Sequence, residues 1–283
     1  MEDKNKQHGH GHGHHHKGNP KDSIKNRLPI GEMKEPIEEF CRSQKELYIS
    51  LQNNTEFPDL EVVDYRYIAE GKHVIILTPL SIFLNKLEDG SKFSGFIFDK
   101  KGRGLKMTKR VYGKFVCKGL TTDDDILLKL AETDELLKKM LTHGAKFFEL
   151  EAKDLNVFFS DFEIFNMDSQ MNPTFAEYTP SGKKRYENSR HIVMEYEDRE
   201  VIFNTLIEGN TYRTLTRADS NKVAYIKNDG EFKFYDGRDR HFLSKITILE
   251  DKCIEDIAEK LRATNHMFFK STDNLLALEF YFK

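Results

Sequence analysis

Four side chains of one expected strand combine positive charge with a phenolic hydroxyl. The stretch LKMTKRVYGKFVCKG, residues 105–119, carries them at even-numbered positions: Lys106, Arg110, Tyr112 and Lys114. Successive side chains of a strand point to opposite faces, so these four share one face, and the other face is almost entirely apolar. Same-face residues four apart lie roughly 13 Å from each other. Arg110 can therefore share a dianionic ligand, such as a phosphate or paired carboxylates, with Lys106 or with Lys114 but not with both.

A second interpretation of the same strand requires no ligand. Lysines on a solvent-facing strand also protect a sheet edge from pairing with another chain, and the sequence leaves both interpretations open. Gly102 and Gly104 in KKGRG indicate a hairpin turn and not a phosphate loop, because no helix pattern follows them. The sequence has no Ser-His-Asp, HExxH, Walker or GxGxxG pattern that would indicate a familiar catalytic class.

Near the N-terminus, histidine alternates with glycine and then repeats, in the stretch HGHGHGHHH. Imidazoles at this density bind nickel, zinc, copper or haem iron, which predicts a metal-binding tail formed by His8, His10, His12, His14, His15 and His16. Two alternatives are an expression tag and a tail whose metal affinity has no consequence. Residues 1–31 are polar and of low complexity, and we predict that they are disordered because they have little apolar surface to bury.

Two further histidines are candidate ligands for an iron atom. His143 follows an expected helix at residues 126–141, and His266 follows another at residues 254–264. At the C-terminal end of a helix, an imidazole also stabilises the last carbonyl groups. Helix capping is therefore the competing interpretation for both.

The composition excludes some broad classes of function. The chain has 283 residues, 32% of them charged, and a formal net charge of −3, so it has no overall attraction to nucleic acid or to a membrane surface. Its three cysteines are widely spaced, which fits neither a disulfide framework nor a zinc motif. No stretch has the length of a membrane span, and the polar N-terminus lacks the apolar run of a signal peptide. We expect a cytoplasmic protein.

The elements that must position the candidate residues are mostly strands. Their apolar runs are rich in β-branched and aromatic residues, and Asp89-Gly90 supplies a hairpin break. For the first half we predict a helix beginning near Pro36, a short helix at 79–88, a helix at 126–141, and strands at 47–52, 60–68, 72–78, 93–98, 105–119, 145–151 and 156–165.

The same order of elements recurs in the second half, which predicts two copies of one β unit. Strands are expected at 190–196, 200–207, 211–216, 222–226, 231–236, 241–249, 267–271 and 275–282. Both copies contain a helix followed by histidine and Phe-Phe, in THGAKFF and TNHMFF. The predicted organisation is a His-rich tail at 1–31, a ligand-binding domain at 32–165, a polar linker at 166–189 and a degenerate second domain at 190–283.

This order, together with Arg110-Val111-Tyr112-Gly113 on a long strand, resembles the split-barrel proteins of the pyridoxamine 5′-phosphate oxidase-like class. The resemblance implies a mainly β fold with helices (α+β), a split β-barrel of the FMN-binding kind, duplicated here in tandem. Flavin-binding members carry Ser-Arg-Lys where this chain has Ser81, Ile82 and Phe83. Two cations that would hold the flavin phosphate are therefore replaced by apolar side chains.

The rest of the pattern resembles the haem-utilisation branch of that class, whose members bind haem and in some cases degrade it. The resemblance implies a protein of haem utilisation and iron acquisition, with Arg110 and either Lys106 or Lys114 on the haem propionates and His143 or His266 as iron ligand. Members of this branch use a C-terminal histidine, which the ending LEFYFK does not offer.

Two alternatives remain open on the sequence. One is an FMN-dependent oxidoreductase of the same fold, with its phosphate on Lys106 and Arg110. The other is a non-enzymatic haem- or metal-binding protein in which the barrel is a scaffold. In each case we expect the two copies to pack as an intramolecular pair of barrels, or the chain to form a homodimer, because a single copy leaves an apolar face exposed.

Overall fold

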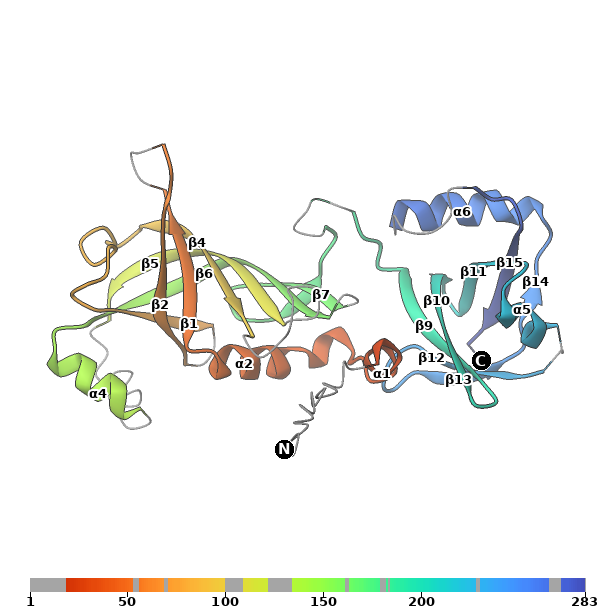
Figure 1. Cartoon of the computed structure of the whole chain (residues 1–283), viewed down its shortest axis with the longest axis horizontal. Helices are drawn as coiled ribbons and strands as arrows, with labels where there is room; N and C mark the ends of the chain where they lie inside the picture. Colours follow the sequence, from red (N-terminus) through yellow and green to blue (C-terminus); the bar gives the residue numbers. More distant parts are fainter. Residues whose placement is uncertain are drawn as a thin grey trace, which may run out of the picture.

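The computed structural model describes residues 19–52, 56–68, 71–99, 109–121, 134–160, 163–178, 182, 184–227, 230–264 and 271–282. Two antiparallel sheets make up most of this part of the chain. They lie at opposite ends of the long axis of the molecule (Figure 1). We call the part around the first sheet, β1–β8, the first unit and the part around the second sheet, β9–β15, the second unit.

The first unit is built on a closed six-stranded barrel. Its strands are β1 (Glu46–Leu51), β2 (Asp59–Tyr67), β3 (Lys72–Leu77), β4 (Lys92–Phe98), β5 (Arg110–Leu120) and β6 (Lys146–Ser160). They follow the order β3-β2-β1-β4-β5-β6, and the pairing of β3 with β6 closes the barrel. Two strands extend the sheet beyond β6: β7 (Glu163–Met167) and β8 (Pro173–Phe175).

The alternation predicted for the long strand is found in β5. Val111, Phe115 and Cys117 are buried inside the barrel, and the side chains between them point outward. The same alternation in β1 and β4 fills the interior with aliphatic and aromatic side chains, because closing a small sheet leaves just enough space for them.

Two helices accompany the first barrel. α2 (Lys34–Ser43) buries Ile37, Phe40 and Cys41 and contacts β2. α4 (Glu135–Thr142) is the described part of the helix predicted at 126–141. The short helix predicted at 79–88 is wrong. Successive backbone bonds, such as Ser81 N–H to Thr78 O and Leu84 N–H to Ser81 O, form tight turns there instead.

The second sheet has the order β13-β12-β9-β10-β11-β15-β14. Its strands are β9 (Ser189–Tyr196), β10 (Arg199–Glu208), β11 (Thr211–Arg217), β12 (Phe232–Tyr235), β13 (His241–Ser244), β14 (Thr247–Ile248) and β15 (Leu275–Tyr281). Each pairing among β9, β10, β11, β12, β13 and β15 repeats a pairing of the first barrel, with β9 in the place of β1 and β15 in the place of β6.

The two copies differ by a break in one strand of the second copy. β5 pairs with both β4 and β6, whereas its counterpart is divided into β13, which pairs with β12, and β14, which pairs with β15. The second copy is therefore a curled sheet whose closing strand is interrupted at Lys245 and Ile246. These pairings confirm the predicted fold class, a mainly β chain that is consistent with a duplicated split barrel.

The helices of the second unit give one confirmation and one correction. α6 (Lys252–Thr264) confirms the helix predicted at 254–264. The strand predicted at 222–226 is wrong, because these residues belong to α5 (Asn221–Ile226). The strand predicted at 267–271 lies almost wholly outside the described residues.

Two of the predicted segments contain secondary structure that was not expected. Residues 19–31, which were predicted to belong to a disordered tail, include α1 (Pro20–Lys25), and η1 (Ile30–Glu32) follows. The predicted linker at 166–189 contains the end of β7, all of β8 and the start of β9. The disorder predicted for residues 1–18 falls outside the described part of the chain.

The N-terminal segment 19–32 joins the two units. α1 packs on β9 and β10, and the Lys25 ammonium lies 3.2 Å from the Glu195 carboxylate. Arg27 Nη2 lies 2.6 Å from the buried carboxylate of Asp236. In the described residues, the first barrel and the curled second sheet do not pack sheet against sheet as duplication predicts (Figure 1).

Candidate functional site on the outer face of the first barrel

We use the name outer face for the outward side chains of β1, β4, β5 and β6. Its central row is aromatic, because Tyr48 of β1 pairs with Phe96 of β4, which pairs with Tyr112 of β5. The Phe96 and Tyr112 rings are stacked with centroids 4.6 Å apart, and the Tyr48 and Phe96 rings are 6.3 Å apart. Tyr112 remains 37% exposed. The row therefore presents a partly solvated aromatic surface across three strands.

A second row places a guanidinium group among aromatic rings. Arg110 pairs with Phe98 of β4 on one side and with Phe158 of β6 on the other. Its guanidinium carbon lies 4.5 Å from the centroid of the Phe158 ring and 5.9 Å from that of Tyr112. Contact with ring faces stabilises the cation and restricts its position, so Arg110 is held at the edge of the aromatic row.

The third row, on the other side of the aromatic row, is polar. Ser50, Ser94 and Lys114 are paired across β1, β4 and β5, and Lys114 is paired with Asp154 of β6. The Lys114 ammonium lies 3.1 Å from the Asp154 carboxylate, with the two side chains 74% and 47% exposed. An ion pair this exposed contributes little to stability and can be exchanged for a ligand anion at small cost.

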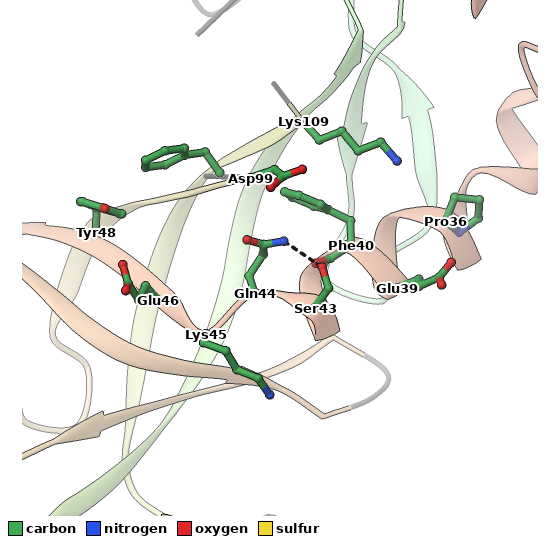
Figure 2. Close-up of a pocket in the computed structure, with 11 residues that line it drawn as sticks. Pro36, Glu39, Phe40, Ser43, Gln44, Lys45, Glu46, Tyr48, Asp99 and Lys109 are labelled. Carbon is green, nitrogen blue, oxygen red and sulfur yellow. Dashed lines mark hydrogen bonds between the residues drawn. The ribbon is translucent and has the colours of Figure 1, made fainter. Parts of the chain in front are cut away.

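A groove of about 500 Å³ continues the outer face toward α2 (Figure 2). Tyr48 and Phe98 belong to both. The groove is lined by Pro36, Glu39, Phe40, Ser43, Gln44, Lys45, Glu46, Tyr48, Phe98, Asp99 and Lys109. Both sides of the groove thus mix aromatic and polar residues, with Tyr48 and Phe98 on the side of the sheet and Phe40 on the side of α2.

Hydrogen bonds and ring contacts hold two walls of the groove. Gln44 Nε2 donates to Ser43 Oγ at 2.8 Å, at the end of α2 (Figure 2). The Lys109 ammonium lies 4.2 Å from the centroid of the Phe159 ring, which itself packs edge-on against Phe40. The Lys109 side chain is exposed, and β5 begins only at the next residue.

The structure brings some predicted site residues together and separates others. Arg110, Tyr112 and Lys114 share the outer face, with the tyrosine between the two cations. Lys106, His266 and the six tail histidines (His8, His10, His12, His14, His15 and His16) lie outside the described residues.

His143 does not join this group. It is the C-cap of α4, where its Nδ1 lies 2.7 Å from the carbonyl oxygen of Lys139. α4 leads into the start of β6 at Lys146, whereas Arg110 pairs with Phe158 near the other end of that strand. Twelve residues of strand separate these ends by roughly 40 Å. His143 and Arg110 therefore cannot contact one cofactor in this structure, and the capping interpretation accounts for His143.

Sequence reasoning missed the aromatic partners of Tyr112. Tyr48, Phe96 and Phe98 belong to strands that were predicted, and Phe96 and Phe98 stand at alternate positions in the sequence. The alternation indicates a shared face, but only the pairing of β1 with β4 and of β4 with β5 brings that face next to Arg110.

His73 is buried inside the barrel, and its Nδ1 lies 2.7 Å from the hydroxyl oxygen of Tyr65. Burial lowers the pKa of His73 to about 4, because the imidazolium form would lose its hydration. The ring packs against Tyr67 and Phe115. His73 is therefore a neutral core residue and does not reach the outer face.

Flavin-binding members of the pyridoxamine 5′-phosphate oxidase-like class hold the flavin phosphate at three positions. The residues at these positions have other roles in this chain. Ser81 Oγ donates to the Glu61 carboxylate at 2.7 Å, and Phe83 is fully buried in the barrel core. Ile82 is 48% exposed. These residues supply no cation for a phosphate.

No protein-family profile and no curated protein matches this chain. Solved structures with similar folds include ChuZ from Campylobacter jejuni, at 14% identity and a TM-score of 0.45 over 57% of this chain and 68% of that protein. HutZ, the haem storage protein from Vibrio cholerae, is 17% identical with a TM-score of 0.38 over 44% of this chain and 92% of its own.

A third similar structure is a protein of the pyridoxinephosphate oxidase family from Clostridium acetobutylicum, related to general stress protein 26. It is 10% identical, with a TM-score of 0.35 over 50% of this chain and 96% of its own. Both branches that the sequence resembles are thus represented among similar structures. The barrel itself is defined by the strand pairing described above.

Proposed function

We propose that the outer face of the first unit binds haem, and that the protein serves haem utilisation and iron acquisition. The observation that carries the proposal is the aromatic row of Tyr48, Phe96 and Tyr112 between two cations, Arg110 and Lys114. A flat, apolar molecule with anionic groups at its edge matches this surface in shape and in charge. The proposal is one of binding, and it includes no reaction.

Haem has three requirements, and the described residues of the outer face meet two of them. The rings offer an aromatic surface three strands wide, roughly 10 Å at the usual strand spacing. Arg110 and Lys114 offer partners for the two propionates, and the planar guanidinium of arginine can bind a carboxylate through two hydrogen bonds. The third requirement, an axial ligand for the iron, is met by no histidine among the described residues of this face.

FMN is the weaker candidate for the same surface. Ser81, Ile82 and Phe83 give no cation where flavin-binding members of the class have two, and Phe83 is part of the core. A flavin phosphate would have to use Arg110 or Lys114 instead. The affinities for haem and for FMN can therefore be compared with the same set of variants.

The test is a titration of wild type and Arg110→Ala with haem and, separately, with FMN. We expect haem to bind wild type more tightly than FMN does. Loss of a charge-assisted contact should cost about 1.5–3 kcal/mol of affinity, roughly ten- to a hundredfold, in Arg110→Ala. The fold should be unaffected, because the side chain lies outside the barrel core.

Lys118→Ala is the matched control for this titration. Lys118 lies on the same strand and the same side as Arg110 and forms an ion pair with Glu151. It is eight residues from Arg110, roughly 26 Å along the strand. Its removal should leave haem affinity unchanged. Equal haem affinity in wild type, Arg110→Ala and the control would sink the proposal, and tighter binding of FMN than of haem would favour the flavin alternative.

A further inference from the structure

A buried carboxylate in the second unit is surrounded by guanidinium groups. Asp236 directly follows β12, and its side chain is wholly buried. Its Oδ1 accepts a hydrogen bond from Arg27 Nη2 at 2.6 Å, and its Oδ2 accepts one from Arg190 Nη2 at 2.7 Å. Arg240 Nε lies 3.9 Å from the same Oδ2. Three arginines thus converge on one carboxylate, and we call these four residues the arginine cluster.

The arginine cluster lies at one end of the curled second sheet. Arg190 is at the start of β9, and Arg240 directly precedes β13. Because neighbouring strands of this sheet are antiparallel, the starts of β9 and β13 meet the end of β12 at the same edge. The side chains of Arg190 and Arg240 are 35% and 34% exposed, whereas that of Arg27 is 13% exposed. Two of the three guanidinium groups can therefore be reached from solvent.

The charges of the cluster do not balance. Burial lowers the pKa of the Arg27 guanidinium, the Asp236 carboxylate raises it, and the positive charge of Arg190 lowers it again. Glu163, from β7, adds a weaker attraction to Arg27. Burial, helped by the charge of Arg27, lowers the pKa of His191 to about 4, so this neighbour is uncharged at neutral pH. Three guanidinium groups against the two carboxylates leave one positive charge in excess.

The two exposed arginines also have donors to offer. Arg190 Nε and Arg240 Nε are buried atoms with no hydrogen-bond acceptor among the described residues. Buried donors of this kind commonly mark the place of a bound water or ion. The Arg240 guanidinium is held by ring contacts, 4.4 Å from the Phe282 centroid and 5.7 Å from that of Tyr212. The arginines are therefore fixed in position without using all of their donors.

We propose that the arginine cluster binds a phosphate group through Arg190 and Arg240, at a site separate from the outer face. Guanidinium groups bind phosphate through planar forks of donors, and the several oxygens of a phosphate can accept from two arginines at once. Its negative charge also offsets the excess positive charge of the cluster. Asp236 is a positioning residue, because it holds Arg190 and Arg27 from the buried side. The phosphate group is either free phosphate or part of a phosphate monoester.

The first test is a calorimetric titration of inorganic phosphate into full-length wild type, Arg190→Gln and Arg240→Gln. We expect one phosphate to bind each wild-type chain. Each variant should lose roughly ten- to a hundredfold in affinity, the usual effect of removing one hydrogen bond between charged groups. Absence of phosphate binding to wild type would overturn the proposal.

Arg238→Gln is the matched control for these variants. It removes the same charge from the loop between β12 and β13, but the Arg238 guanidinium already lies 2.6 Å from Glu32 and 3.1 Å from Asp239. Its affinity for phosphate should equal that of wild type. If Arg238→Gln loses as much affinity as Arg190→Gln and Arg240→Gln, phosphate responds only to the overall charge of this end of the sheet, and the proposal is wrong.

A second test requires no variant and therefore does not depend on how a variant folds. Phenylglyoxal modifies accessible arginines, and mass spectrometry of the digested protein gives the rate at each position. Inorganic phosphate should slow the modification of Arg190 and Arg240 and leave that of Arg238 unchanged. Equal rates with and without phosphate would contradict the proposal. Equal protection by chloride or acetate would contradict it as well, because it would show attraction of any anion.

The same protection experiment identifies the source of the phosphate group. Glycerol 3-phosphate is compared with inorganic phosphate at equal concentration. Stronger protection of Arg190 and Arg240 by glycerol 3-phosphate would support a site for a phosphate monoester. Equal or weaker protection would support a site for the free anion.

Discussion

At the scale of single residues, burial and not spacing decides which histidine can do chemistry. His73 and Tyr65 form a hydrogen-bonded pair at 2.7 Å inside the barrel, and both side chains are fully buried. Burial lowers the pKa of His73 to about 4, far below the ordinary value of 6.5. His73 is therefore an uncharged residue of the core, although the sequence shows only a histidine in a strand. Its burial makes the stability of the first barrel sensitive to acid.

The sign of this sensitivity follows from proton uptake. Between pH 6.5 and 4 the unfolded chain protonates His73 and the folded protein does not, so stability is lost as the pH falls through this window. The contribution of His73 should drop by about 2 kcal/mol from pH 7 to pH 5. Chemical denaturation of wild type and His73→Gln at both pH values measures it. If the difference in unfolding free energy between the two proteins is the same at pH 7 and pH 5, the imidazole is not buried in its neutral form.

At the scale of elements, a pair of glycines lets β4 and β5 hold the central ring of the barrel. Gly95 and Gly113 are directly paired, and the Phe115 ring lies against both. A methyl group at Gly113 would stand 2.5 Å from a Phe115 ring carbon and 2.6 Å from a Leu155 methyl carbon. The glycine of Arg110-Val111-Tyr112-Gly113 is thus explained by packing inside the barrel, while the arginine of the same motif serves the outer face.

Gly113→Ala should destabilise the protein by about 1–3 kcal/mol, because the added methyl group overpacks the core. Gly31→Ala is the control, since no atom lies within 4 Å of the position its methyl group would take, and its effect should stay within about 0.5 kcal/mol. Denaturant unfolding of both variants gives the comparison. Equal stability of Gly113→Ala and wild type would mean that Phe115 does not occupy this space.

Some elements of the fold could be predicted from the sequence alone, and others could not. Alternation in residues 105–119 correctly predicted the two faces of β5 where the strand is described, since the period of two is local information. In residues 222–226, Val223 and Ile226 are the buried pair, three apart as in a helix, and the preceding turn at Ser220 starts α5. A short apolar run does not distinguish strand from helix by itself, which is why the prediction was wrong there.

The candidate site was predictable only in part, for a related reason. Arg110, Tyr112 and Lys114 follow from one strand, but Tyr48 and Phe96 join them through strand pairing, and pairing partners are not written in the sequence of either strand. His143 and Arg110 were both predicted to bind haem in the first domain. The length of β6 places them near opposite ends of that strand.

At the scale of the whole molecule, α1, at the start of the N-terminal segment 19–32, acts as part of the second unit. Ile24 of α1 is 1% exposed, and α1 packs on β9. Ile192 and Met194 of β9 point into the core of the second sheet, so the fully buried Val193 lies on the opposite face, the side open to α1. Arg27 completes the contact through its ion pair with Asp236, whose side chain is wholly buried.

Removing residues 1–18 should therefore leave thermal stability unchanged, and removing residues 1–31 should lower it. The longer deletion uncovers the outer side of β9 and removes one partner of the buried Asp236 carboxylate, which keeps Arg190 and Tyr212. Loss of one hydrogen bond to a charged group is worth about 1.5–3 kcal/mol. Calorimetry of the two truncated proteins beside the full chain measures the difference. Identical melting curves for all three would contradict the bridging role of α1.

The claim on which the account depends is that haem binds the outer face, and the absence of tryptophan from the chain allows a direct test. Tyr112→Trp places a single fluorophore in the aromatic row, and Tyr281→Trp places one at a similarly exposed position of the second unit, where the tyrosines are 37% and 42% exposed. Energy transfer to haem falls steeply with distance. One equivalent of haem should quench tryptophan at position 112 almost completely and at position 281 much less. Equal quenching at the two positions, or stronger quenching at 281, would contradict the account.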